Sequence, residues 1–263
     1  MNGVDVDVLQ VHLRALRMPT AREVIGETIT LAEKEDWSIA TFMRELLERE
    51  LEGRRERRIA RNLKSSHLPP GKTAAALDTK RLPQRIRRQF QQLCGGEFVD
   101  RADNVLVFGL PGRGKTHLAA AIGHELVQQG RRVLFSPTFK IVDRLQRAKR
   151  DLELERELRR LDRFEVLILD DLGYVQQSRD EVEVLFTLLA ERYERRSVVI
   201  TSNLVFSEWD RIFKDPLTTA AAVDRVVHHS VIIEFGEGTR SIRADEARTR
   251  NKKEASSPSR QTD

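Results

Sequence analysis

An eight-residue string near the middle of the chain restricts the fold more than any other segment. Residues 109–116 read Gly-Leu-Pro-Gly-Arg-Gly-Lys-Thr and match the pattern Gly-x-x-x-x-Gly-Lys-[Ser/Thr]. The apolar run at 105–108 precedes the string and predicts a strand, and the pattern of residues 115–129 predicts a helix. Glycines let backbone N–H groups turn inward around phosphate oxygens, and the start of a helix adds partial positive charge. The context therefore predicts a phosphate-binding loop rather than an ordinary glycine-rich turn.

This loop predicts ATP and Mg²⁺ as cofactors. Lys115 is expected to reach the β- and γ-phosphates, and the Thr116 hydroxyl is expected to bind Mg²⁺. The other residues expected to contact the nucleotide surround them in the loop and at the start of the helix: Gly109, Pro111, Gly112, Arg113, Gly114 and His117.

Two acidic residues follow another apolar run. Residues 166–169, Val-Leu-Ile-Leu, predict a buried strand that ends at Asp170 and Asp171. Ligands bind at this end of the strands in open α/β sheets. Asp170 is therefore a candidate ligand of Mg²⁺, directly or through water, and Asp171 a candidate to orient or deprotonate the attacking water. Two aspartates could also cap a helix, but their position 55 residues after Lys115, with one strand in between, favours the metal and water roles.

Four further residues are candidates for contact with the phosphates. Asn203 follows the strand predicted at 198–200 and would contact the attacking water or the γ-phosphate, although Ser-Asn after a strand also suits a turn. Arg225 would stabilise transition-state charge in a neighbouring subunit, or form an ion pair with Asp224. Arg240 and Arg243 would contact phosphate in the same subunit, or remain surface charges.

The alternation of apolar strands with helices predicts an α/β fold with a five-stranded parallel sheet. The remaining strands are predicted at 132–135 and 231–233, and the helices at 115–129, 138–160 and 180–195. Residues 4–64 predict a small all-helical domain. In it, a first helix stops near Pro19, Thr20 caps a second helix that runs to Leu31, and Ser38 precedes a third.

These patterns divide the chain into four parts. Residues 1–68 form the helical domain, which ends in a basic helix. Residues 69–103 form a basic linker with a lead-in helix at 83–93, residues 104–247 form the nucleotide-binding domain, and residues 248–263 form a polar, basic, disordered tail. The Pro-Pro-Gly sequence at 69–71 ends the basic helix and sets the first boundary.

Positive charge is concentrated in one part of the chain. The net charge is +5, but residues 1–53 carry −5 and residues 54–88 carry +10. Such a concentration predicts a polyanionic partner, and we expect duplex DNA. The candidate contacts lie in two segments: Arg54, Arg55, Arg57, Arg58, Arg61 and Lys64, and then Lys140, Arg144 and Arg147. The alternative is that these are solvated helix faces, with the second segment salt-bridged to Glu153 and Glu155.

Several classes of protein and site are not expected. The longest apolar runs are strand-sized, and no basic-then-apolar leader is present, so we expect a cytoplasmic protein without a membrane partner. Cys94 is the single cysteine, so no intramolecular disulfide forms, and no structural metal is expected. His228 and His229 have no evident third ligand in the sequence and are interpreted as structural residues.

Several strings go beyond a generic nucleotide-binding loop. Gly-Lys-Thr-His-Leu-Ala at 114–119 resembles the initiator and helicase-loader clade of AAA+ ATPases. Other strings resemble the IstB family in particular, and they lie at 13–19, 68–69, 170–174, 192–195, 201–203, 208–209, 224–225, 228–229 and 236–240. The resemblance covers about residues 8–245. It implies an ATPase that assembles on duplex DNA, bends it and presents it to a partner transposase, with hydrolysis regulating assembly and release.

The resemblance also implies roles for individual residues. It supports the loop at 109–116, Asp170 as metal ligand, Asp171 as water-activating acid and Asn203 as sensor. It also supports Arg225 as the arginine finger, the side chain that stabilises transition-state charge in a neighbouring subunit. It adds Arg240 as a second sensor of the nucleotide, and it implies that the helical segment at 137–158 contacts DNA.

The chain departs from the family pattern at several positions. Many members have Glu in place of Asp171, and Leu110 and Arg113 replace the usual Pro and Thr. Little chain follows Arg240, so a full helical lid domain is not expected. Two other functions remain open: a replicative helicase loader with the same ATPase core, and an architectural DNA-binding protein indifferent to ATP. A metabolic kinase fits least, since it would leave the basic segment unexplained.

Overall fold

The computed structural model describes residues 3–173, 179–204 and 226–236 of the 263-residue chain. Its contacts divide the chain into two compact units, residues 1–61 and 62–263. The division falls inside one helix, α3 (Ile39–Ser66), seven residues before the boundary expected from the proline-rich break. The side chain of Asn62 donates hydrogen bonds to the carbonyls of Gly130 and Arg131, which explains why the end of α3 belongs to the second unit.

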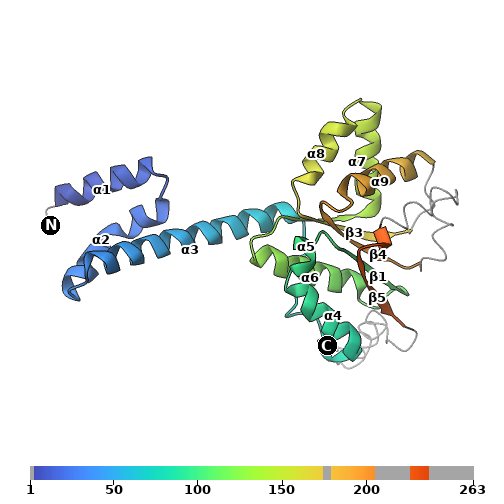
Figure 1. The fold of residues 1–263 in the computed structure, drawn as a ribbon, viewed down its shortest axis with the longest axis horizontal. Helices are drawn as coiled ribbons and strands as arrows, with labels where there is room; N and C mark the ends of the chain where they lie inside the picture. Colours follow the sequence, from blue (N-terminus) through green and yellow to red (C-terminus); the bar gives the residue numbers. More distant parts are fainter. Residues whose placement is uncertain (1–2, 174–178, 205–225, 237–263) are drawn as a thin grey trace, which may run out of the picture. The chain divides into compact units, whose positions relative to one another are not determined.

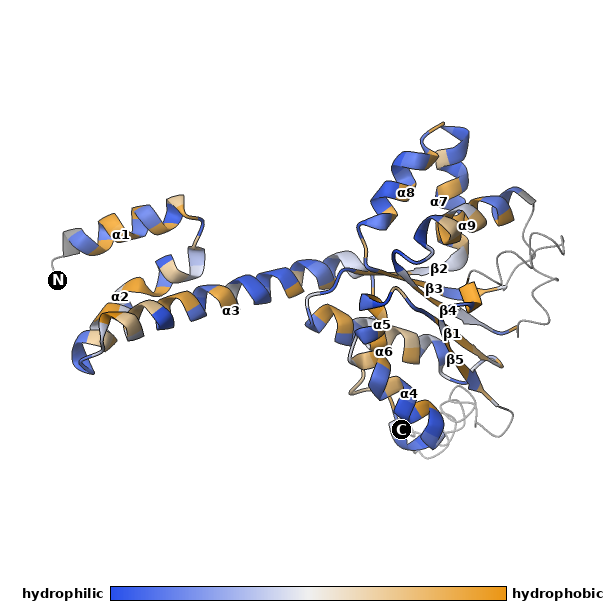
Figure 2. Cartoon of the chain, viewed as in Figure 1, coloured by the Kyte–Doolittle hydropathy of each residue, from blue (hydrophilic) through white to orange (hydrophobic). Residues whose placement is uncertain are grey.

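The first unit consists of α1 (Gly3–Ala15), α2 (Pro19–Lys34) and the first part of α3. Its core contains four buried residues, Ala21, Ile25, Ile29 and Leu46. Figure 2 shows hydrophilic and hydrophobic residues interspersed along these helices.

The predicted start of α2 is wrong. Thr20 does not cap this helix. Instead, Pro19 occupies the first turn, where the missing N–H of proline has no partner to lose, and Met18 is the N-cap residue. The Thr20 hydroxyl accepts a hydrogen bond of 2.6 Å from Arg57 of α3. At the start of α3, the Ser38 hydroxyl accepts a hydrogen bond from the N–H of Thr41, so here the predicted start is confirmed.

Glu50 links the helices of the first unit. Its side chain is almost fully buried. One carboxylate oxygen accepts a hydrogen bond of 3.0 Å from the N–H of Ala21, and the other accepts from Arg54 and Arg57. Burial by itself raises the pKa of Glu50, but hydrogen bonds from Ala21 and Arg54 outweigh it, so the pKa lies below the ordinary value. The ionised carboxylate therefore holds α2 against α3.

The second unit is built on a five-stranded parallel sheet, as the sequence predicts (Figure 1). The strands are β1 (Asn104–Gly109), β2 (Val133–Pro137), β3 (Val166–Leu172), β4 (Ser197–Ser202) and β5 (Ser230–Phe235). Their order in the sheet is β2-β3-β4-β1-β5, so the crossovers bring β1 between β4 and β5. Because all strands are parallel, their carboxyl ends meet at one edge of the sheet.

Helices cover both faces of this sheet. Figure 1 shows α4 (Gln84–Cys94), α5 (Glu97–Asp100) and α6 (Lys115–Gln128) on one side, and α7 (Thr138–Arg150), α8 (Leu154–Asp162) and α9 (Arg179–Arg192) on the other. Strands covered on both faces are apolar along their length, which explains the continuous apolar runs of the sequence. None of the helices that the structure describes combines the length and apolar character that crossing a bilayer requires.

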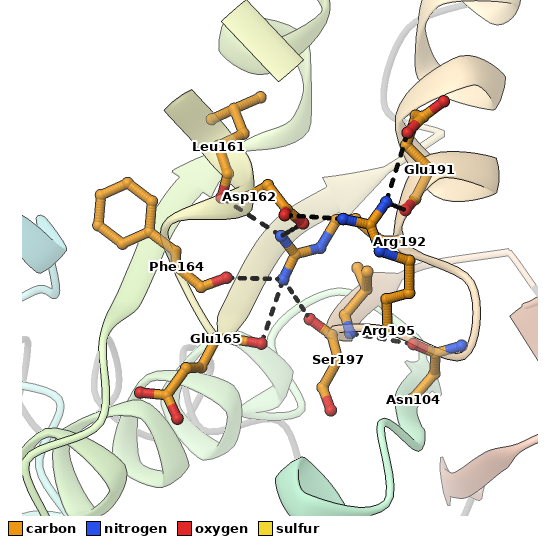
Figure 3. A network of polar contacts seen from close by, with 10 residues as sticks. Asn104, Leu161, Asp162, Phe164, Glu165, Glu191, Arg192, Arg195 and Ser197 are labelled. Atoms are coloured by element: carbon orange, nitrogen blue, oxygen red, sulfur yellow. Dashed lines mark hydrogen bonds and ion pairs between the residues drawn. The ribbon is translucent and has the colours of Figure 1, made fainter. Parts of the chain in front are cut away.

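Arg192 holds the amino ends of two strands in place (Figure 3). This residue is the last of α9, and its side chain is 2% exposed. Its guanidinium donates hydrogen bonds of 3.0–3.3 Å to four carbonyl oxygens, which belong to Leu161, Phe164, Glu165 and Ser197. These carbonyls lie at the end of α8, before β3 and at the start of β4. One side chain therefore joins α9 to β3 and β4, two of the strands that lead to predicted site residues.

Burial lowers the pKa of Arg192 to about 9, and the carboxylate of Asp162 opposes this shift. The guanidinium therefore stays charged at neutral pH. It is balanced by carbonyl dipoles and by Asp162, whose nearest oxygen is 4.0 Å away.

Replacing Arg192 with Leu should destabilise the second unit strongly. The substitution removes the donor that all four carbonyls share, although those of Leu161 and Glu165 each keep a bond from a backbone N–H. Removing one member of a buried polar network costs about 3–5 kcal/mol. Urea unfolding followed by circular dichroism measures this change. Arg195→Leu is the matched control, because the Arg195 side chain is 58% exposed and its ion pairs with Asp162 and Glu191 are worth about 1 kcal/mol or less. Equal unfolding midpoints for the two variants would contradict the role of Arg192.

Candidate nucleotide-binding site

The loop between β1 and α6 has the backbone that its glycines allow. Gly109, Gly112 and Gly114 have φ angles of +145°, +79° and +97°. Side chains disfavour this region, and a Cβ at Gly109 would also overlap Phe235 of β5. Gly114 is the N-cap of α6, so the loop leads directly into the helix that begins at Lys115. The start of this helix provides N–H donors and partial positive charge, which is an anion-binding arrangement.

Lys115 lies inside this loop and is buried. Its ammonium group donates hydrogen bonds to the carbonyls of Gly109 (2.7 Å) and Leu110 (3.0 Å) and to Oδ1 of Asn203 (2.6 Å). A buried ammonium requires such acceptors because it has lost its water. Phosphate oxygens would offer stronger, charged acceptors at the same place.

Asn203 connects the loop to the acidic strand. It follows β4, and its side-chain amide donates a hydrogen bond of 3.0 Å to Oδ1 of Asp171. The same side chain accepts from Lys115 through its oxygen. The structure thus brings together three residues that the sequence predicts as site residues, from the ends of β1, β3 and β4.

Asp171 has an unusual backbone. Its φ is +63°, and the pairing of β3 with β4 shifts register between Leu169 and Leu172. Such an irregularity redirects a side chain near a site. The N–H of Asp171 donates to the hydroxyl of Thr201 (2.8 Å), and that hydroxyl donates to Oδ1 of Asp170 (2.6 Å).

Thr201 is therefore a candidate site residue that the sequence analysis did not select. It lies in the polar cluster at the end of β4, directly before Ser202 and Asn203, and its signal was its place in that cluster. Its hydroxyl fixes both aspartates at once.

The oxygen atoms near the loop fit a magnesium ion. Mg²⁺ prefers oxygen ligands and usually keeps several waters, so it needs only one or two from the protein. Thr116 offers a hydroxyl at the start of α6 and is only partly buried. Asp170 uses one oxygen for Thr201 and keeps the other for a cation.

The structure places His117 against another segment. Its ring nitrogen Nε2 lies 3.1 Å from the carbonyl of Thr73, and His124, two turns later, makes the same kind of contact with Pro69. Both histidines of α6 therefore hold the segment after α3. Contact of His117 with the nucleotide stays a prediction. Arg225, Arg240 and Arg243 lie outside the described residues.

The cations of α3 fall into two groups. Arg54 and Arg57 bind the buried carboxylate of Glu50, and Arg55 lies 3.9 Å from Glu52. These three arginines therefore have carboxylate partners on their own helix.

Arg58, Arg61 and Lys64 form the second group. They are exposed, they lie three residues apart, and within the described part of the chain none forms an ion pair. A spacing of three keeps successive side chains on adjoining parts of one helical face. Figure 2 shows this part of α3 as mostly hydrophilic.

The cations of α7 are also divided. Arg144 pairs with the buried Glu157 of α8, and Arg147 pairs with Asp143 at 2.8 Å. Lys140 is exposed and has no ion pair with a described residue. Two of the three candidate DNA-binding cations of α7 are therefore in ion pairs.

The partners of these cations differ from those named in the sequence analysis. Glu153 and Glu155 pair with Arg156 and Arg159 of α8, at 2.9 and 2.6 Å.

Two solved structures share the fold of the second unit. The crystal structure of DnaI has a TM-score of 0.54 and 21% sequence identity, and the match covers 65% of this chain and 96% of that one. AMPPCP-bound DnaA from Aquifex aeolicus has a TM-score of 0.54 and 17% identity, covering 74% and 59%. At such identities the likeness shows the fold alone, which is the AAA+ type of P-loop fold.

Relatives found by sequence have higher sequence identity to this chain than these two structures. A putative insertion sequence ATP-binding protein of Sinorhizobium fredii is 45% identical over 235 residues, which are 89% of this chain and 79% of the relative. The insertion sequence IS21 putative ATP-binding protein of Pseudomonas aeruginosa is 36% identical over 247 residues, which are 94% and 91%. The model of the family described as IstB-like ATP binding protein matches residues 11–255. This chain belongs to the IstB-like ATP-binding protein family.

Proposed function

We propose that this protein is a Mg²⁺-dependent ATPase that assembles on duplex DNA in the cytoplasm and presents the DNA to a partner transposase. The observation that carries the ATPase part is the hydrogen-bonded chain from Lys115 through Asn203 to Asp171. Hydrolysis requires three roles, which are phosphate binding, γ-phosphate sensing and water activation. The two hydrogen bonds connect the residues proposed for these roles.

Each residue has a distinct role in this proposal. When ATP enters the loop, Lys115 exchanges its carbonyl and amide acceptors for phosphate oxygens. The amide oxygen of Asn203 is then free to accept from the attacking water, and the second N–H of the same amide can donate to the γ-phosphate. Asp171 accepts a proton from that water. The hydrogen bond from its backbone N–H to Thr201 fixes the main chain, and the bond from Asn203 orients its carboxylate.

Thr116 and Asp170 would hold Mg²⁺, which neutralises charge on the phosphates. Thr201 positions Asp170 for this role by donating to one of its oxygens. Arg225 of a neighbouring subunit completes the site, so nucleotide binding and assembly depend on one another.

The names of the relatives support the DNA and transposase part of the proposal. Both relatives described above are named for insertion sequences, which are themselves segments of DNA. Arg58, Arg61 and Lys64 supply a row of exposed cations that suits a phosphate backbone, and Lys140 supplies another cation on α7.

Lys115→Ala should bind ATP about 10- to 100-fold more weakly than the wild type, because it loses charge-assisted hydrogen bonds worth about 1.5–3 kcal/mol. Titration of a fluorescent ATP analogue measures the change. In light scattering with a linear duplex, the wild type should form large complexes with ATP but not with ADP, and Lys115→Ala should form none.

Lys72→Ala is the matched control, because Lys72 lies in the segment after α3 and outside the loop. Complexes of equal mass with ATP, with ADP and with Lys115→Ala would contradict the proposal that ATP controls assembly. They would favour an architectural DNA-binding protein instead. Transposase stimulation by the wild type, measured as strand transfer, then separates the proposed partner from a helicase.

Asp171→Asn should keep ATP affinity within about twofold and lose about 100- to 10,000-fold in hydrolysis rate, because asparagine cannot take the proton. The carbonyl of the new amide can still accept from Asn203, so the local geometry survives. Phosphate release and analogue titration measure the two quantities separately. Asp151→Asn, in the exposed turn after α7, is the control. An unchanged hydrolysis rate in Asp171→Asn would exclude this residue as the base.

A triple variant, Arg58→Ala with Arg61→Ala and Lys64→Ala, should weaken DNA binding and flatten its dependence on salt. Each lost phosphate contact lowers the slope of log K against log[salt] by about 0.9, so the slope should fall by about 2.7. Fluorescence anisotropy over a salt series measures it. A control triple removes three arginines that have local carboxylate partners, Arg49, Arg156 and Arg159. Equal slopes for the two triples would show that the α3 row does not contact DNA.

A further inference from the structure

The edge of the sheet opposite the nucleotide loop carries a cluster that the proposed function does not use. β5 starts at Ser230, and the preceding residue, His229, accepts a hydrogen bond of 2.7 Å at its carbonyl from the N–H of Asn104. Asn104 is the first residue of β1, and the phosphate-binding loop follows the other end of that strand. His228 and His229 therefore lie at the amino edge of the sheet, away from Lys115 and Asp170.

At this edge the structure supplies the third ligand that the sequence analysis did not find. Glu194, which follows α9, contributes a carboxylate oxygen that lies with one ring nitrogen of His228 and one of His229 within a span of 4.8 Å. Among the described residues, no other group of three or more His, Cys, Asp or Glu side chains meets this condition. The structure therefore places a carboxylate beside the two histidines that the sequence does not reveal, while their interpretation as structural residues stays a prediction.

The three side chains already face one another. Nε2 of His229 lies 3.5 Å from Oε1 of Glu194, and the two imidazole rings are 4.2 Å apart in an edge-to-face arrangement. The hydroxyl of Tyr193 lies 3.2 Å from Nδ1 of His228 and orients that ring. Hydrogen bonds of this kind orient ligating histidines in metalloproteins and raise metal affinity. All three ligands are exposed, so an ion can reach them from solvent.

We propose that Glu194, His228 and His229 form a binding site for a borderline transition-metal ion, with Zn²⁺ as the best fit. Two imidazoles and a carboxylate are a common zinc ligand set, and three protein ligands leave a fourth position for water. Nitrogen donors disfavour Mg²⁺ and Ca²⁺, so this site is chemically distinct from the one at Thr116 and Asp170. The bound ion would join the end of α9 to the start of β5, two segments about 35 residues apart.

The test uses the full-length, untagged protein in the absence of nucleotide, because ATP and an affinity tag both bind Zn²⁺. Calorimetric titration with ZnCl₂ should show one ion per chain. Co²⁺ should give the visible absorption of a four-coordinate site with nitrogen and oxygen ligands. His229→Gln and Glu194→Gln should each weaken binding by at least about tenfold. Zn²⁺ should also raise the thermal midpoint of the wild type, because an ion that binds the folded state stabilises it.

His12→Gln is the matched control, since it removes an exposed histidine of α1. This control should bind Zn²⁺ as the wild type does and should show the same rise in thermal midpoint. Because the ligands are exposed, the variants should keep the far-ultraviolet circular dichroism of the wild type. Zn²⁺ affinity that is equal in His229→Gln and the wild type would overturn the proposal, as would the absence of a saturable one-to-one binding step.

Discussion

The hydrogen bond between Lys115 and Asn203 is the interaction on which the candidate nucleotide site depends. It is 2.6 Å long and joins the loop after β1 to the residue after β4. The two strands are neighbours, and Phe108 pairs with Ser202 at their carboxyl ends. Because a buried ammonium must keep its acceptors, Asn203 is held in place while the loop contains no phosphate. The same amide bonds Asp171, so the occupancy of the loop and the orientation of the acid are physically linked.

Much of this site could be predicted from the sequence because its parts lie at the ends of strands. Apolar runs that stop at a glycine loop, at two aspartates and at an asparagine indicate both the parallel sheet and the edge at which these residues meet. The backbone of Asp171 could not be predicted in the same way. Its positive φ and the register shift in β3 depend on how β3 pairs with β4, and the bond from its N–H to Thr201 spans 30 residues.

The partners of charged residues also could not be predicted from the sequence. Arg192 stands in a run of mostly charged residues, Arg-Tyr-Glu-Arg-Arg, that gives no sign of burial, yet its buried guanidinium bonds carbonyls before β3 and at the start of β4. The basic helix shows the same limit. Its composition predicts a uniform cationic surface, but Glu50 has two of the arginines as partners and leaves Arg58, Arg61 and Lys64 exposed. Counting charges gives the sign of a surface, whereas tertiary contacts decide which charges are available.

The two edges of the sheet differ in how they are held. At the amino edge, the guanidinium of Arg192 satisfies carbonyls before β3 and at the start of β4, and Asn104 bonds both the N–H of Val198 and the carbonyl of Val226. These contacts use backbone groups, which cannot change without moving a strand. At the carboxyl edge, the contacts among Lys115, Asn203 and Asp171 use side-chain groups that can exchange partners. In the proposed function, a change of nucleotide state would therefore act most easily on side chains at the carboxyl edge, while the strands that carry them stay fixed from the other end.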